Sequence, residues 1–200
     1  MKLSPQQETG NLTACLKSYY RSSKFIDMTI VTTGKEFRVH KLLETSTDTV
    51  KLMDDDTRFV QVMIDFMYGC DYDSSENGNS SSILFHIGVY QIADKYDVPN
   101  LKRHAKLQFE NLVNIVWQMD DFPLAIAEAY AATPESHRGL RDAIVRIVGL
   151  HISDLLEMES FVKVLERTSG FSDDMAKSMF RERHTNDDWD QCNLNNGWGH

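Results

Sequence analysis

The pattern of apolar and polar residues predicts a short β-sheet near the N-terminus, with helices after it. Apolar and polar residues alternate from Ile26 to Val31 and again from 36 to 40. Such alternation is typical of half-buried strands, and the glycine within Thr32–Lys35 suits a tight turn between them. Thr49–Leu52 gives a third short alternation. These segments predict a β-hairpin followed by a third brief strand.

Apolar residues at helical spacing dominate the rest of the chain. Three aspartates at 54–56 precede a strongly apolar stretch, which predicts a helix beginning near Thr57, buried on several sides and ending at Gly69. Further helices are expected over 85–96, 101–116, 123–130, 134–151, 161–168 and 172–180. The predicted fold class is α+β, with a small β-sheet, a surrounding helical cluster and an all-α C-terminal extension.

The same patterns divide the chain into segments. Residues 1–24 are an N-terminal segment with a short helix, and residues 25–118 are the α+β domain. This domain contains a polar loop at 73–82, which is rich in Ser, Asn and Gly. Residues 119–180 are the helical extension, and residues 181–200 contain few apolar side chains. The last segment is therefore expected to be a disordered tail.

Charge and composition narrow the classes of partner. A formal net charge of -9 over 200 residues argues against direct binding to DNA or RNA, which depends on Lys and Arg neutralising phosphates. Three widely separated cysteines cannot form a disulfide framework. The N-terminus is polar, and no apolar run reaches the roughly 20 residues that span a bilayer. We expect an intracellular protein of the nucleus or cytoplasm, without membrane partners.

Candidate chemistry is sparse. His40 invites a catalytic interpretation, but the sequence contains none of the patterns Gly-x-Ser-x-Gly, His-Glu-x-x-His or Cys-x-x-Cys. His184, Cys192 and His200 are fewer than the four ligands of a structural zinc site. Met67, like Met63 and Cys70, is expected to pack in the core. We therefore expect no enzymatic activity, no metal and no cofactor.

Three ordered segments, 25–41, 50–72 and 92–105, resemble the BTB/POZ family. The matching positions are Asp27, His40 and Lys41 around the hairpin, Tyr68, Gly69 and Tyr72 after the apolar helix, and Ala93, Asp94, Tyr96 and Val98 further on. Residues 137–148 resemble the helical extension that follows this domain in fungal members. The resemblance implies a protein interaction domain, which commonly forms dimers.

One departure from the family pattern affects this interpretation. In the family a helical hairpin follows the His-basic pair, packs on the sheet and supplies much of the dimer interface. Here His40-Lys41 continues directly into Leu42-Leu43-Glu44, which fits the family motif that precedes the third strand. The resemblance therefore implies that the hairpin is missing between Lys41 and Leu42. Its loss would leave apolar faces of the strands and of the following helix exposed.

The resemblance also implies candidate partner-binding residues. Asp27 and Lys41 correspond to a charged pair near the family's dimer interface, where opposite charges set partner specificity. Leu42 and Glu44 correspond to the motif with which some members dock a cullin scaffold of ubiquitin ligases. The favoured function is a protein–protein interaction adaptor or scaffold, with self-association or a cullin as further possibilities. The alternatives are an enzyme or metal-binding protein whose site the sequence does not reveal, and a non-functional shortened gene product.

Overall fold

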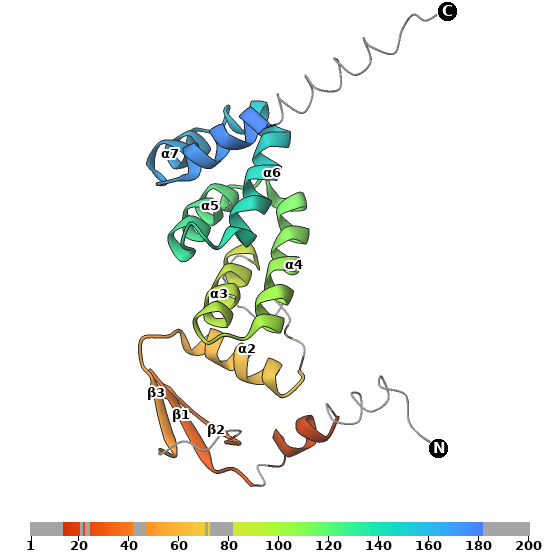
Figure 1. The fold of residues 1–200 in the computed structure, drawn as a ribbon, viewed down its shortest axis with the longest axis vertical. Helices are drawn as coiled ribbons and strands as arrows, with labels where there is room; N and C mark the ends of the chain where they lie inside the picture. The colour runs from red at the N-terminus through yellow and green to blue at the C-terminus, as the bar shows by residue number, and fades with distance from the viewer. Residues whose placement is uncertain are drawn as a thin grey trace, which may run out of the picture. The chain divides into compact units, whose positions relative to one another are not determined.

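The structure, a computed structural model, describes residues 14–20, 22, 25–41, 47–70, 72 and 82–181. These residues form a small three-stranded sheet and a series of helices (Figure 1), which confirms the coarse α+β class. The described residues divide into two compact units, one drawn from Met1–Gly78 and Gly88–Arg103 and the other from Asn79–Ile87 and His104–His200. The domain boundary expected near residue 118 stays a prediction. Most of the expected polar loop and tail lies outside the described residues.

The sheet belongs to the first unit and has the strand order β2-β1-β3. Strands β1 (Met28–Thr32) and β2 (Lys35–Val39) pair antiparallel, with Thr32 opposite Lys35. Gly34 closes the intervening turn with a φ of +103°, a left-handed conformation that favours glycine. The predicted hairpin is therefore confirmed, with bounds shifted by one or two residues.

The third strand, β3 (Thr49–Leu52), pairs parallel with β1. Because β1 and β3 run in the same direction, both begin at the end of the sheet where β2 finishes. The chain therefore leaves β2 and enters β3 at the same end of the sheet. The junction between Lys41 and Leu42 falls in this connection, of which residues 42–46 lie outside the described part of the chain.

Helix α2 (Thr57–Met67) begins and ends where the sequence predicts. Asp56 caps its N-terminus, because its Oδ1 accepts a hydrogen bond of 2.8 Å from the Arg58 backbone N–H. Gly69 adopts a φ of +77° just beyond the helix, as C-terminal glycines commonly do. Both boundary signals are local, which explains why they could be identified in the sequence.

Burial of α2 differs from the prediction. Val60, Met63 and Ile64 are buried along one stripe, and other apolar residues of the helix are only half-buried. Met67 continues this stripe at the last residue of the helix but is 50% exposed. The prediction that Met67 packs in the core is therefore wrong, because the packing that covers the stripe stops before the helix ends.

Two long helices follow, α3 (Ser82–Lys95) and α4 (Pro99–Val116). The C-terminal part of α3 packs against α2 in the first unit, where the Phe59 ring lies directly over Gly88. A Cβ atom added at Gly88 would overlap this ring. Gly88 therefore permits the close approach of the two helices.

Gly88→Ala is expected to destabilise the first unit by about 1–3 kcal/mol, the usual cost of overpacking. Gly149→Ala is the matched control, because Gly149 is also helical but has nothing within 4 Å of an added Cβ. This substitution should stabilise its helix by up to ~1 kcal/mol through the higher helix propensity of alanine. Urea unfolding of both variants measures the difference. Equal stabilisation by the two substitutions would contradict the packing of Phe59 on Gly88.

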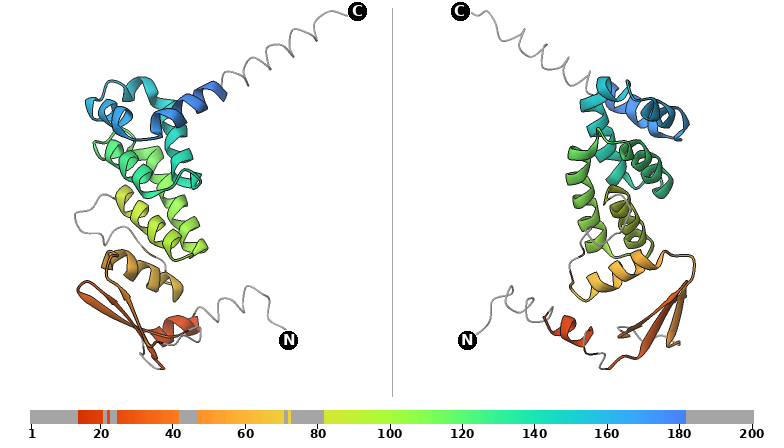
Figure 2. Two further views of the ribbon diagram at one scale, coloured as in Figure 1. Left: turned by 60° about the vertical axis from the view of Figure 1, so that its left-hand side comes forward. Right: turned by 180° about the vertical axis from the view of Figure 1, so that it is seen from behind.

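The second unit contains α5 (Asp121–Ala132), α6 (Arg138–Leu155), α7 (Glu159–Arg167) and a final helical segment at 171–181. Figures 1 and 2 show α5 beside α6 and α7. Its fully buried side chains include Phe122, Ile126, Leu140, Ile144, Leu155, Phe161 and Phe171. None of the helices in the described part of the chain has the length and apolar composition needed to cross a membrane.

Candidate functional site

Two of the four predicted partner-binding residues, Asp27 and Lys41, lie together at the open end of the hairpin. Asp27 precedes β1 and Lys41 follows β2. The Lys41 backbone N–H donates to Asp27 Oδ1 over 2.6 Å. The Asp27 backbone N–H in turn donates to the Val39 carbonyl over 3.4 Å. Asp27 therefore closes the hairpin by binding the backbone of Lys41.

The Lys41 ammonium contacts a residue that the sequence did not single out. Its Nζ lies 3.2 Å from Asp48 Oδ1, and the Asp48 carboxylate is largely exposed. Exposed ion pairs of this kind contribute about 0–1 kcal/mol to stability, so the main effect of this pair is to fix the position of the Lys41 side chain. The Asp48 carbonyl also accepts from the Thr29 N–H over 2.8 Å, next to the pairing of β1 with β3. An acidic residue just before the third strand was the only sequence signal for this role.

The other two predicted residues, Leu42 and Glu44, lie outside the described residues. Their assignment to partner binding stays a prediction of the family resemblance.

His40 is bound to Tyr68, which lies just after α2. The Tyr68 hydroxyl oxygen accepts from the His40 backbone N–H over 2.8 Å and lies 2.7 Å from His40 Nδ1. The Tyr68 hydroxyl can donate its own proton to Nδ1 or accept a proton from it, depending on the tautomer of the imidazole. Burial raises the pKa of Tyr68 above its ordinary value. His40 thus links the end of β2 to α2.

An aromatic residue of the N-terminal segment covers the same tyrosine. Tyr20 stacks on Tyr68 with ring centroids 4.4 Å apart, and the amide of Gln61 donates to the Tyr20 hydroxyl over 3.1 Å. Burial raises the pKa of Tyr20 to about 12. The helical segment at 14–20 therefore packs against α2 near its C-terminal end.

Helix α2 covers only part of the apolar face of the sheet (Figures 1 and 2). The Thr57 hydroxyl donates to Thr32 Oγ1 over 2.9 Å, and the Lys35 ammonium donates to Gln61 Oε1. These contacts anchor α2 over the turn of the hairpin and β2. Phe37 and Val39 of β2, which belong to the apolar face, are accordingly buried.

The remainder of this face is less well covered, and we call it the open sheet face. It consists of Met28, Ile30, Val50 and Leu52, which share one side of β1 and β3 by their register with Phe37 and Val39. All four are only half-buried, although β1 is the central strand. Phe25, which is 77% exposed, and Met53, which is 50% exposed, add further apolar surface to this unit.

Groups suited to metal binding are not clustered in the part of the chain that the structure describes. Among those residues, no group of three or more His, Cys, Asp or Glu side chains is placed to hold a metal ion. His184, Cys192 and His200, which were considered as zinc ligands, lie outside the described residues. Cys70 is half-buried and Cys15 is exposed, and both are free thiols.

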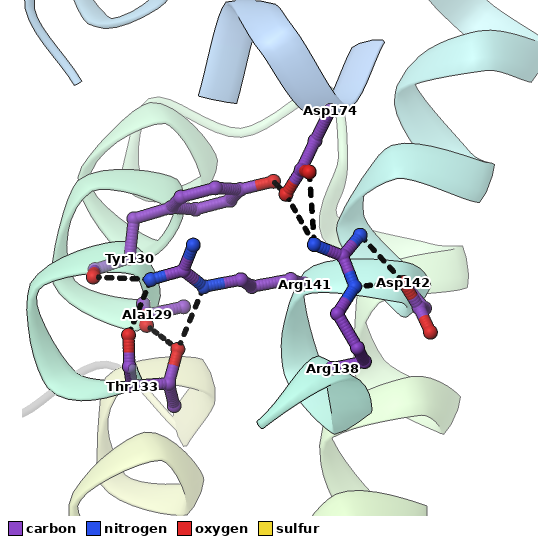
Figure 3. A network of polar contacts seen from close by, with 7 residues as sticks. All are labelled: Ala129, Tyr130, Thr133, Arg138, Arg141, Asp142 and Asp174. Carbon is purple, nitrogen blue, oxygen red and sulfur yellow. Dashed lines mark hydrogen bonds and ion pairs between the residues drawn. The ribbon is translucent and has the colours of Figure 1, made fainter. Parts of the chain in front are cut away.

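The second unit contains a buried polar network around Arg141 (Figure 3), which is only 5% exposed. Its guanidinium donates to the carbonyls of Tyr130 and Thr133 and, over 3.1 Å, to Thr133 Oγ1. It also lies over the Tyr130 ring, 4.5 Å from the centroid. Arg141 therefore satisfies carbonyls at the C-terminal end of α5, where positive charge is favourable.

Asp174 joins this network from the final helical segment (Figure 3). Its carboxylate accepts from the Tyr130 hydroxyl over 2.9 Å and from Arg138 over 2.8 Å. Burial, followed by the contact with Asp174, raises the pKa of Tyr130 above its ordinary value. The network connects residues far apart in the chain, and it was not predicted from the sequence.

Comparisons with known proteins give no match, either to a family model or to a curated protein. The likeness to the BTB/POZ family therefore stays a prediction, which depends on the residues quoted for it.

Proposed function

We propose that the chain is a protein–protein interaction adaptor, without chemistry of its own, that binds partner proteins through the open sheet face. The observation that carries this proposal is the incomplete burial of Ile30, because the central strand of a sheet is normally covered where its side chains are apolar. Contiguous apolar surface marks interaction sites in folded proteins. Covering it would contribute roughly 25 cal/mol per Å² of apolar area removed from water.

The connection between β2 and β3 supports the same proposal. β2 ends and β3 begins on either side of the point where the resemblance implies a missing helical hairpin, and that hairpin packs on the sheet in the BTB/POZ family. The absence of that hairpin would account for the incomplete cover of this face by the described residues. The partner would take the position of the absent helices.

Two kinds of partner follow from the resemblance. A second copy of this chain is the first, and self-association is its direct consequence. A cullin scaffold is the second, and it depends on Leu42 and Glu44, which lie outside the described residues. We take self-association as the testable case, because it needs only the chain itself.

The unaltered chain is expected to form polydisperse oligomers whose mean mass rises with concentration, since an open apolar face without a matching surface does not select one assembly. The variant Val50→Lys with Leu52→Glu places opposite charges on the open sheet face without changing the net charge. It should reduce association by at least about tenfold, an effect of ~1.4 kcal/mol. Light scattering and sedimentation velocity over a wide concentration range measure this.

The matched control is Leu124→Lys with Leu150→Glu, which makes the same change at exposed leucines of the second unit. It should associate like the unaltered chain. Inserting a helical hairpin between Lys41 and Leu42 should instead give a discrete dimer. A well-defined, concentration-independent dimer of the unaltered chain, or a monomer at every concentration, would contradict the proposal.

A further inference from the structure

A basic cavity lies between α6 and the final helical segment of the second unit. Its volume is about 440 Å³, within the range of small-ligand sites. The side chains that line it are Arg138, Asp142, Val145, Arg146, Asp174, Lys177, Ser178 and Arg181. Four of these are basic and two are acidic, which leaves two formal positive charges in excess. The chain as a whole carries a formal net charge of -9, so the sign of the cavity is opposite to that of the molecule.

The two carboxylates of the cavity are both bound to one arginine. Arg138 contacts Asp174 over 2.8 Å and Asp142 over 2.8 Å. Asp142 also precedes Arg146 by one helical turn, a spacing that favours an ion pair in the sequence. The structure pairs Asp142 with Arg138 instead, because Arg138 is already held by the buried Asp174 and its remaining N–H groups face Asp142.

Three cations of the cavity remain available to a ligand. Within the described residues, Arg146, Lys177 and Arg181 have no carboxylate partner. Ser178, which also lines the cavity, is half-buried. Two guanidinium groups and an ammonium group supply many N–H donors but no acceptor, so a ligand that complements them carries several anionic oxygens.

We propose that this cavity binds a phosphate group, held by Arg146, Lys177 and Arg181. A phosphate monoester carries up to about two negative charges and three terminal oxygens at neutral pH, which matches the excess charge better than a single carboxylate does. Clusters of arginine with a hydroxyl are a recurrent means of recognising phosphorylated groups. The site lies in the second unit and is independent of the open sheet face.

The test uses the full chain with inorganic phosphate and O-phosphoserine as probes, at constant ionic strength set with sodium chloride. Isothermal titration calorimetry and the shift in thermal midpoint should show saturable binding of at least one probe. The variant Arg146→Gln with Lys177→Gln should weaken binding at least tenfold. Both side chains are exposed, and circular dichroism checks that the variant remains folded.

The matched control is Arg103→Gln with Lys106→Gln on α4, which removes the same charge from side chains that do not line the cavity. Its affinity should stay within about twofold of the unaltered chain, since exposed charges that do not contact the ligand are screened by salt. Tighter binding of O-phosphoserine than of inorganic phosphate would support a phosphorylated side chain as the ligand, and equal binding would support free phosphate. Absence of saturable binding, or equal losses in the two variants, would overturn the proposal.

Discussion

Arg141→Met is expected to destabilise the second unit by about 2–5 kcal/mol, because each buried polar group left without its hydrogen-bond partner costs about 1–3 kcal/mol. Methionine has similar length and fills much of the same space, so the loss reports on polar contacts. The carbonyls of Tyr130 and Thr133 and the Thr133 hydroxyl would each lose a buried donor. Urea unfolding followed by circular dichroism measures the change.

Two further variants isolate the cause of this effect. Arg141→Lys should recover little of the loss, because a single ammonium group lacks the planar fork that reaches both carbonyls and the hydroxyl. Arg146→Met on the same helix is the matched control, and it should change stability by no more than about 0.5 kcal/mol because Arg146 is exposed. Similar losses for Arg141→Met and Arg146→Met would show that the network does not stabilise the unit.

The extent to which the sequence predicted the fold follows from the range of the interactions involved. The hairpin and α2 depend on alternation, a turn glycine and an Asp cap, all within a few residues, and the structure contains them. Arg141 depends on contacts with residues 8 and 11 positions away, and its network extends to Asp174. Arginine in a helix is normally exposed, so no local pattern distinguishes one that is buried.

The candidate site was likewise predicted only in part from the sequence. The likeness to BTB/POZ domains implied that Asp27 and Lys41 form a charged pair that binds a partner, and the structure joins them through the Lys41 backbone N–H. It did not predict that Asp27 would bind the Lys41 backbone or that Asp48 would lie beside the Lys41 ammonium. Those contacts depend on where β3 joins the sheet, and this is set by tertiary structure. The prediction that Met67 is buried was wrong for the same reason. Its spacing fits the buried stripe of α2, but at the end of the helix it is 50% exposed.

A buried histidine should make the stability of the chain depend on pH. His86 of α3 is 3% exposed, and burial, reinforced by the nearby charge of His104, lowers its pKa to about 4 from an ordinary value of 6.5. Between these two values the unfolded chain binds a proton that the folded chain excludes. The contribution of neutral His86 to the stability of the fold is therefore present in full above pH 6.5, and it is lost progressively as the pH falls toward 4.

The expected loss from this group is on the order of 3 kcal/mol by pH 4, with a slope approaching ~1.4 kcal/mol per pH unit where the unfolded histidine is protonated. Urea unfolding between pH 7.5 and 4.5 measures it by difference between the unaltered chain and His86→Gln, since carboxylates titrate similarly in both. The difference between the two curves should shrink as the pH falls, because the variant has no group to protonate at this position. His104→Gln is the control, and it should keep most of the slope, because burial is the larger cause of the shift. Parallel plots of unfolding free energy against pH for the unaltered chain and His86→Gln would contradict this prediction. They would show that another group causes the pH dependence and that protonation of His86 does not destabilise the fold.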